Sequence, residues 1–228
     1  MSWVDGAKRR AAEAAAQHVS SGTVIGLGTG STAKHVIRII GSYLSAGTLT
    51  DILGVPTSKQ TSIDAREAGI PLTTLDDHPV ITLSIDGADL IDGDLNAIKG
   101  GGGALLREKI VASASKKYIL IADERKIVKK LGTGFPLPIE VLPFAATPAA
   151  IKVGRLGASV TLRKGKRGPV TTDNGNFVLD ADFGPIDDPD GLERKLKSIP
   201  GVLETGLFLG YADLAYVGTL DSVRKLRK

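Results

Sequence analysis

The chain has 228 residues, of which 42% are hydrophobic and 24% charged, as expected for a globular protein with a substantial core. It has no cysteine, which excludes disulfides, thiolate zinc sites and a cysteine nucleophile. Aromatic residues make up 4%, which argues against base stacking, and the net charge of +4 suits a small anionic substrate better than nucleic acid because the basic clusters lie in separate elements.

The first 130 residues alternate short apolar runs with helical patterns. Helices are expected at 7–19, 31–44, 58–68 and 104–115, and strands at 23–27, 51–55, 80–85 and 118–122. Nearly continuous apolar strands that alternate with helices are typical of a parallel sheet covered on both faces. The sequence therefore predicts an α/β fold with a doubly wound, mostly parallel, Rossmann-like sheet.

A different order of elements follows residue 134. Strands are expected at 139–144, 158–163, 177–181 and 202–209, and helices at 148–156 and 188–198. This β-α-β-β-α-β order is that of a ferredoxin-like α+β domain. We expect a catalytic α/β domain of residues 1–130 and 210–228, to which 212–217 returns a strand, and a smaller domain of 131–209. The basic stretch 163–167 favours a solvated hairpin over a contact with a partner subunit.

A turn of glycines and hydroxyl residues follows the first strand. It contains Thr29, Gly30, Ser31 and Thr32, and a helix begins within it. The first N–H groups of a helix and its positive dipole end attract an anion, and the hydroxyls add donors. These residues predict a phosphate site, although a tight turn in which serine caps the helix has the same pattern.

A dinucleotide site is a weaker interpretation of the same turn. Ser31 stands where the glycine fingerprint has its last glycine, and the second strand ends in the neutral Thr57 and Ser58 instead of an acidic residue. Thr57 and Ser58 suit the lining of a sugar site, but capping of the next helix is the more usual role. We therefore expect no nicotinamide cofactor.

Two carboxylates follow the third strand in the segment Asp86, Gly87, Ala88 and Asp89. The end of a parallel strand lies at the sheet edge where open α/β folds bind ligands. Paired carboxylates there can grip sugar hydroxyls, transfer protons or hold a metal ion. An ordinary acidic turn is the alternative, and we favour a functional role for Asp86 and Asp89.

The most informative segment runs from Lys99 through Gly100, Gly101 and Gly102 to Glu108. Consecutive glycines entering a helix present backbone N–H donors, and Lys99 adds a cation. A carboxylate, a cation and N–H donors are the groups required to remove a proton beside a carbonyl. A solvated glutamate paired with a basic neighbour in its helix is the alternative for Glu108.

Lys126 follows the fourth strand and suits either phosphate binding at the same sheet edge or an ordinary surface position. The histidines, His18, His35 and His78, are too far apart for a metal-ligand spacing, although carboxylates could still hold magnesium. We expect no metal. The N-terminus has no long apolar run and no membrane span is visible, which favours a cytoplasmic protein without membrane partners.

Taken in order, these segments resemble the type A ribose-5-phosphate isomerase family. The resemblance rests on 28–32 (GTGST), 86–89 (DGAD), 99–102 (KGGG) and 107–109 (REK), and it covers essentially the whole chain. Each motif is modest alone, but the ordered set is highly specific. One departure is Leu90, where the family commonly has glutamate, and we expect it to affect loop packing rather than chemistry.

The resemblance implies a metal-free aldose-ketose isomerase that converts D-ribose 5-phosphate to D-ribulose 5-phosphate in the non-oxidative pentose phosphate pathway. It implies Glu108 as the proton acceptor, substrate binding by 29–32, 86–89, 99–102 and Lys126, and a homodimer or homotetramer. From the chemistry of ring opening we add Asp86 or Asp89, and from oxyanion stabilisation we add Lys99.

Two other functions fit parts of the pattern. A non-catalytic sugar-phosphate sensor would usually accompany a DNA-binding segment, and residues 1–20 supply one short helix. Such a sensor also has no need for a base beside a cation. An amino-sugar phosphate deaminase of similar architecture is the third possibility, and the ordered motifs favour the isomerase over it.

Overall fold

The computed structural model describes residues 2–227. Within that range the chain forms two compact units, each built from segments distant in sequence. The first unit holds Met1–Ala88, Arg107–Lys126 and Tyr211–Lys228, and the second holds Asp89–Leu106 and Ile127–Gly210. The predicted domain bounds, 1–130 with 210–228 and 131–209, stay a prediction, because compactness alone does not show which segments fold independently.

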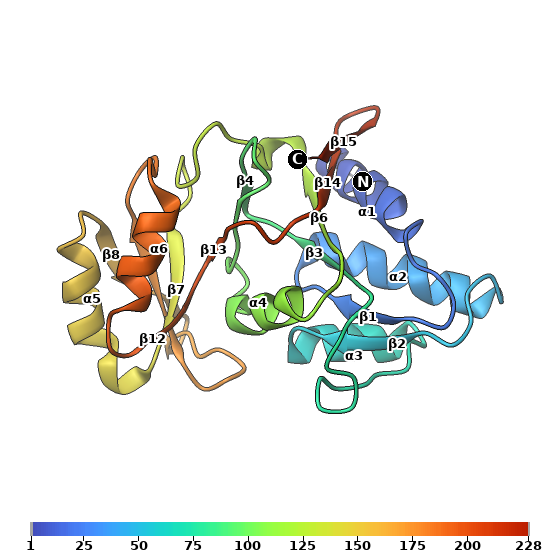
Figure 1. Ribbon diagram of the computed structural model, residues 1–228, viewed down its shortest axis with the longest axis horizontal. Helices are drawn as coiled ribbons and strands as arrows, with labels where there is room; N and C mark the ends of the chain where they lie inside the picture. The colour runs from blue at the N-terminus through green and yellow to red at the C-terminus, as the bar shows by residue number, and fades with distance from the viewer. Residues whose placement is uncertain (1, 228) are drawn as a thin grey trace. The chain divides into compact units, whose positions relative to one another are not determined.

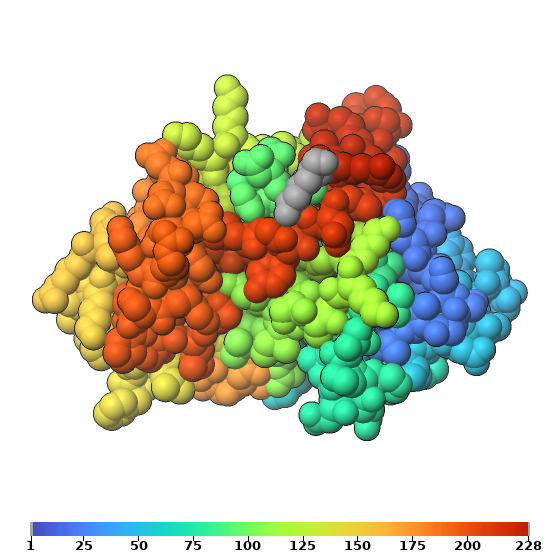
Figure 2. Space-filling model, viewed as in Figure 1, coloured from blue at the N-terminus to red at the C-terminus, as the bar shows by residue number. Residues whose placement is uncertain are grey.

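The first unit contains a six-stranded sheet in the order β15-β14-β6-β3-β1-β2 (Figure 1). All neighbouring strands are parallel except β15, which pairs antiparallel with β14. The strands are β1 (Val24–Leu27), β2 (Leu53–Pro56), β3 (Leu83–Gly87), β6 (Tyr118–Asp123), β14 (Leu214–Gly218) and β15 (Val223–Arg227). The prediction that 212–217 returns to this sheet is confirmed, whereas β15 was not expected. Figure 2 shows β15, in dark red, at the molecular surface.

Four helices accompany this sheet: α1 (Trp3–Ala16), α2 (Ser31–Ser45), α3 (Lys59–Glu67) and α4 (Leu105–Ser113). Ser2 and Ser58 cap α1 and α3, because their hydroxyl oxygens accept the N–H groups of Asp5 and Thr61. The alternation of these helices with parallel strands confirms the predicted doubly wound sheet.

The strand order places a topological switch point between β1 and β3. From β1 the chain passes through α2 to β2 on one side, and then returns through α3 to β3 on the other side. At such a point the chain segments that follow the two strands turn away from each other. This leaves a crevice at the carboxyl ends of the strands. Residues 28–32 and 86–88 therefore lie at the position where this class of sheet binds ligands.

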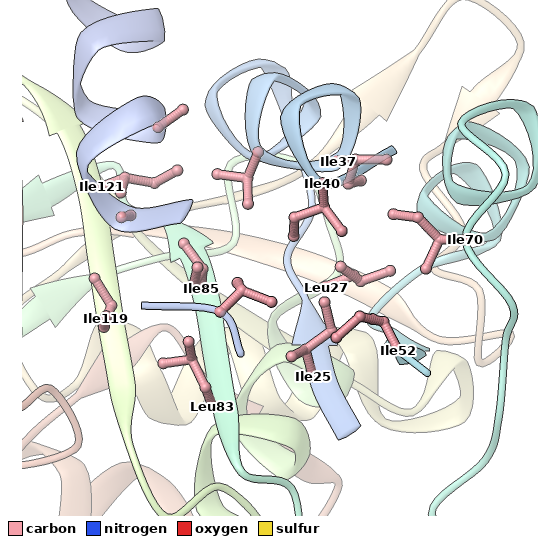
Figure 3. Close-up of a cluster of buried hydrophobic side chains, with 14 of the residues drawn as sticks. Ile25, Leu27, Ile37, Ile40, Ile52, Ile70, Leu83, Ile85, Ile119 and Ile121 are labelled. Atoms are coloured by element: carbon pink, nitrogen blue, oxygen red, sulfur yellow. The ribbon is translucent and has the colours of Figure 1, made fainter. Parts of the chain in front are cut away.

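An apolar core fixes α1 and α2 against one face of the sheet. Ile25 and Leu27 of β1 alternate with Gly26, so both side chains point to this face, where Ile37 and Ile40 of α2 meet them (Figure 3). On the opposite face, a Cβ built on Gly26 would lie 2.6 Å from Cγ1 of Val111, a residue of α4. The sheet is thus covered on both sides, as its apolar strands predict.

The second unit contains a four-stranded antiparallel sheet in the order β12-β7-β11-β8. Its elements, in chain order, are β7 (Leu137–Val141), α5 (Ala146–Gly154), β8 (Ser159–Leu162), β11 (Phe177–Asp182), α6 (Pro189–Lys197) and β12 (Val202–Thr205). Ile139 of β7, Val153 of α5 and Leu196 of α6 are all 0% exposed in one apolar cluster. Both helices therefore cover one face (Figure 1), and the ferredoxin-like prediction is confirmed.

The expected strand at 202–209 is two strands in different sheets. β12 ends at Thr205, and β13 (Leu207–Phe208) pairs with β5 (Ala97–Ile98), which pairs in turn with β4 (Leu90–Ile91). Gly206 lies at the break, where an added Cβ would come within 2.3 Å of the carbonyl oxygen of Lys99. The close approach of this backbone to Lys99 ends the first strand.

Three short helical or hairpin pieces complete the chain. They are the 3-10 turns η1 (Glu124–Lys126) and η2 (Pro143–Ala145) and the hairpin of β9 (Lys164–Gly165) with β10 (Gly168–Pro169). Over residues 2–227, no helix is both long enough and apolar enough to span a bilayer.

Candidate active site

The turn after β1 leads directly into the N-terminus of α2. Gly30, and not Ser31, is the N-cap of α2, and it has no side chain with which to accept the first N–H groups of the helix. Lys8 of α1 places its ammonium Nζ 2.9 Å from Oγ of Ser31. The structure thus adds a cation to the predicted phosphate site. The sequence showed Lys8 only as part of a basic cluster in another helix.

Asp86 connects the ends of β3 and β1. Its side chain is 1% exposed, and Oδ1 accepts the N–H groups of Thr29 at 3.0 Å and Gly87 at 2.7 Å. A Cβ added to Gly28 would lie 2.1 Å from Oδ1 and 2.6 Å from Cα of Asp86, so only glycine fits there. The predicted glycine turn and Asp86 of the predicted acidic turn are therefore parts of one arrangement within the first unit.

The hydroxyl of Thr29 faces a polar cluster of the protein. Its Oγ1 lies 2.7 Å from Thr57 Oγ1, 2.9 Å from Ser58 Oγ and 3.1 Å from Thr61 Oγ1. Ser58 also caps α3, as the sequence suggested, while Thr61 was not anticipated. Both the backbone N–H and the hydroxyl of Thr29 are thus engaged within the protein, and the substrate contacts of Thr29, Ser31 and Thr32 stay predictions.

In the second unit, Asp89 holds the glycine loop. Its Oδ2 accepts the N–H of Gly101 at 2.7 Å, and its own N–H donates to the carbonyl of Ile98. A Cβ on Gly101 would come within 2.7 Å of Oδ1 of Asp89, which repeats the relation of Gly28 to Asp86. The second predicted aspartate and the glycine run are thus joined locally.

Lys99 is a buried cation. It is 2% exposed, its N–H donates to the carbonyl of Gly206, and its Nζ lies 5.4 Å from the ring centroid of Phe208. An aromatic face attracts an ammonium group at this range and shields it from water. Phe208 is more than a hundred residues away in sequence, and no local pattern indicated it.

Glu108 lies in the first turn of α4 and is 5% exposed; its neighbour Lys109 is 6% exposed. The alternative of a solvated surface pair is therefore wrong for this glutamate. Buried ionisable groups of this kind concentrate at functional sites.

Lys126 ends η1, just after the carboxyl end of β6, the strand beside β3. In the same turn, burial alone would raise the pKa of the Asp123 carboxyl, but the hydrogen bonds and charge of Arg125 outweigh burial and lower that pKa. Arg125 donates from Nε to Oδ1 at 2.7 Å and from Nη2 to Oδ2 at 3.2 Å. The ionised Asp123 thus fixes the turn that carries Lys126.

Within residues 2–227, no group of three histidine, aspartate or glutamate side chains is arranged to hold a metal ion. The expected independence of metals stays a prediction.

Comparison with known proteins agrees along the whole chain. The family model described as ribose 5-phosphate isomerase A (phosphoriboisomerase A) matches residues 53–222. The ribose-5-phosphate isomerase A of Desulfatibacillum aliphaticivorans is 50% identical over 224 residues, which are 98% of this chain and 97% of the relative. That of Methanothermobacter thermautotrophicus is 49% identical over 222 residues, 96% of this chain and 97% of the relative.

The chain belongs to the ribose 5-phosphate isomerase A family.

Solved structures of ribose 5-phosphate isomerases also match the whole fold. One, in complex with phospho-erythronic acid, has a TM-score of 0.97 and 44% identity, with 100% of both chains covered. The ribose 5-phosphate isomerase A of Methanocaldococcus jannaschii has a TM-score of 0.94 and 42% identity, covering 98% of this chain and 99% of that one. The suspected family membership and the predicted fold class are thereby confirmed.

Leu90 is the position at which this member departs from the expected isomerase A pattern. It is 5% exposed in β4, and its side chain joins the apolar cluster of the second unit. A leucine there adds to the apolar core beside Asp89, and its lack of effect on the chemistry stays a prediction.

The basic stretch 163–167 contains exposed side chains and one partly buried side chain. Lys166 and Arg167 are exposed, as a solvated hairpin requires, but the side chain of Arg163 is 17% exposed and forms an ion pair with Asp180. Arg163 is therefore partly buried and paired within the second unit.

Proposed function

We propose that the chain interconverts D-ribose 5-phosphate and D-ribulose 5-phosphate, with Glu108 as the base. The observation that carries this proposal is the burial of Glu108 at the start of α4, a few residues after the Lys99 to Gly102 loop. A carboxylate shielded from water abstracts a proton more readily than a solvated one. The curated relatives, which bear the name of this enzyme over nearly their full length, support the same reaction.

Phosphate binding is assigned to the first unit. The N-terminus of α2, the hydroxyls of Ser31 and Thr32, and the ammonium of Lys8 supply donors and positive charge. Lys126, which follows strand β6 of the same sheet, adds a second cation. The phosphate takes no part in bond breaking, but its binding energy positions the reacting carbons.

Ring opening is assigned to Asp86 or Asp89. One carboxylate removes the proton of the anomeric hydroxyl, the bond between C1 and the ring oxygen breaks, and the ring oxygen receives a proton. The product is the open aldehyde. Hydrogen bonds from backbone N–H groups hold both carboxylates in fixed orientations, which suits directed proton transfer.

The isomerisation itself moves one carbon-bound proton. The Glu108 carboxylate removes the proton from C2, the C1–C2 double bond forms, and the electrons of the aldehyde C=O move to its oxygen to give a cis-enediolate. The proton returns to C1, the C2 hydroxyl loses its proton to O1, and C2 becomes the ketone. One carboxyl group suffices because the proton leaves and returns on the same side.

Lys99 and the N–H groups of the glycine loop are assigned to the developing oxyanion. Preorganised donors of this kind are each worth about 10²–10³ in rate. The solved homologue in complex with phospho-erythronic acid supports an enediolate intermediate, because the carboxylate of that phosphorylated acid has two coplanar oxygens, as an enediolate does.

The remaining expectations concern the setting of the enzyme. We propose a role in the non-oxidative pentose phosphate pathway, a cytoplasmic location and a homodimer or homotetramer. Light scattering of the purified protein over a range of concentrations decides its assembly state.

The test is conversion of ribose 5-phosphate to ribulose 5-phosphate by wild type and Glu108→Gln, each with and without a chelator. We expect chelator-resistant turnover in the wild type and a kcat lower by about 10²–10⁴ in the variant. Glu67→Gln, at an exposed position of α3, is the matched control. Binding of the sugar phosphate by folded wild type without turnover would move the assignment to a sensor.

A further inference from the structure

Arg163 grips the backbone of the glycine loop. Its Nη1 donates to the carbonyl oxygens of Gly100 at 2.8 Å and Gly101 at 3.2 Å. On its other side, Nε and Nη2 donate to the two carboxylate oxygens of Asp180, at 2.9 and 2.5 Å. Arg163 lies just after β8 and Asp180 lies in β11, so the neighbouring strands of one antiparallel sheet hold the guanidinium. Such a bidentate pair has a fixed geometry.

This contact determines where the loop N–H groups point. In a planar trans peptide the carbonyl and the following N–H point in opposite directions. The carbonyl of Gly100 shares its peptide with the N–H of Gly101, and the carbonyl of Gly101 shares its peptide with the N–H of Gly102. Because Arg163 holds both carbonyls, both N–H groups are directed away from it. The N–H of Gly101 meets Asp89 there, at 2.7 Å.

The loop needs such an external constraint. Glycines lose more conformational freedom on ordering than other residues, and Gly100 has a φ of +104°, outside the range that other residues favour. A guanidinium charge on the carbonyl oxygens also polarises the two peptides, which strengthens their N–H groups as donors.

We propose that Arg163, fixed by Asp180, is a positioning residue that aims and polarises the N–H of Gly102 toward an enediolate oxygen, while Asp89 accepts the N–H of Gly101. The inference deepens the proposed function and rests on it for the identity of the oxyanion. Asp89 and Arg163 hold the loop from opposite sides of the same peptide, one through its N–H and the other through its carbonyl.

The kinetic test compares Arg163→Ala, Arg163→Lys and Asp180→Asn with wild type. We expect Arg163→Ala to lower kcat by about 10–100-fold with little change in KM, because a donor displaced by a fraction of an ångström loses most of its effect in the transition state. Arg163→Lys keeps the positive charge but loses the planar guanidinium group with its several N–H donors. Its kcat should therefore lie between those of wild type and Arg163→Ala. Guanidinium ion, below denaturing concentrations, should restore part of the kcat of Arg163→Ala.

Arg167→Ala, at an exposed position of the adjoining hairpin, is the matched control. A folded Arg163→Ala with the kcat of wild type would overturn the proposal, and so would a loss of activity matched by the control. A change confined to KM would also overturn it.

Amide hydrogen exchange supplies a readout that does not depend on turnover. Exchange in a peptide covering residues 99–106 should be faster in Arg163→Ala than in wild type or Arg167→Ala, and equal exchange would overturn the positioning role. A wild type that fails to isomerise ribose 5-phosphate would overturn the proposed function instead, and the exchange comparison would still decide whether Arg163 holds the loop.

Discussion

Oδ1 of Asp86 accepts the backbone N–H of Thr29 at 3.0 Å and thereby joins the carboxyl ends of two neighbouring parallel strands. The bond crosses the switch point of the sheet, where β1 and β3 lead to helices on opposite sides. The same oxygen also accepts the N–H of Gly87. A single buried carboxylate thus sets the spacing between the phosphate turn and the acidic turn.

Gly28→Ala should disturb this junction. The new methyl would meet Oδ1 of Asp86 at 2.1 Å and force Asp86 or the turn to move, at a cost of about 1–3 kcal/mol in the free energy of unfolding. We expect a lower melting temperature and a lower kcat/KM. Gly93→Ala is the control, because a Cβ there has no heavy atom within 4 Å among the described residues. Equal behaviour of the two variants would contradict the assigned junction.

Lys99→Met removes the positive charge at position 99 but keeps a side chain of similar volume. Methionine fills a similar volume against Phe208, and it removes the desolvation cost of a buried cation. We expect kcat to fall by about 10²–10³ while the melting temperature stays the same or rises. Steady-state kinetics and thermal denaturation measure both quantities. A change in KM alone would argue against a role in oxyanion stabilisation.

Lys8→Ala should weaken recognition of the phosphate. Loss of one charge-assisted contact raises KM by about tenfold or more, with a smaller change in kcat. Inorganic phosphate should also become a weaker competitive inhibitor of the variant. Lys129→Ala, which removes an exposed lysine far along the chain, serves for comparison. Unchanged inhibition by phosphate would remove Lys8 from the site.

His18 should make the stability of the first unit depend on pH. Burial, and then the charges of Lys117, Lys225 and Arg227, lower the pKa of His18 below 6.5, while its Nε2 lies 2.8 Å from the hydroxyl of Tyr216. The unfolded chain therefore binds a proton more readily than the folded one, so this contribution is complete above pH 6.5 and is lost as the pH falls toward the folded pKa.

His18→Gln should therefore show a smaller fall in melting temperature than wild type between pH 7 and pH 5. Thermal denaturation in matched buffers measures the difference. An equal fall in melting temperature for the two proteins would show that His18 does not cause the pH dependence of stability.

The sequence predicted those features that short-range patterns determine. Apolar runs that alternate with helical patterns predicted both sheets. Ser58 was recognised as a helix cap because serine is a preferred residue at the start of a helix. The motifs at 28–32, 86–89 and 99–102 were identified because glycines, hydroxyls and carboxylates stand next to one another in the chain. Local chemistry of this kind needs no knowledge of the fold.

Contacts between distant segments could not be predicted in this way. Phe208 reaches Lys99 and Arg163 reaches Gly100 through pairings between strands that no spacing in the sequence encodes. Lys8 meets Ser31 because α1 packs on α2. The break at Gly206 likewise arises from the backbone of Lys99, which lies beside it in space but far from it in sequence.

The strand β15 gives the six-stranded sheet a positively charged border. Arg224, Lys225 and Arg227 are exposed along this outermost strand, which is antiparallel to its neighbour β14. An outer strand offers unsatisfied backbone groups to any extended chain, and lysine and arginine discourage such pairing. A second copy that tried to extend the sheet strand against strand would bring three cations toward three others. The charges of β15 thus disfavour the pairing of two such sheets edge to edge.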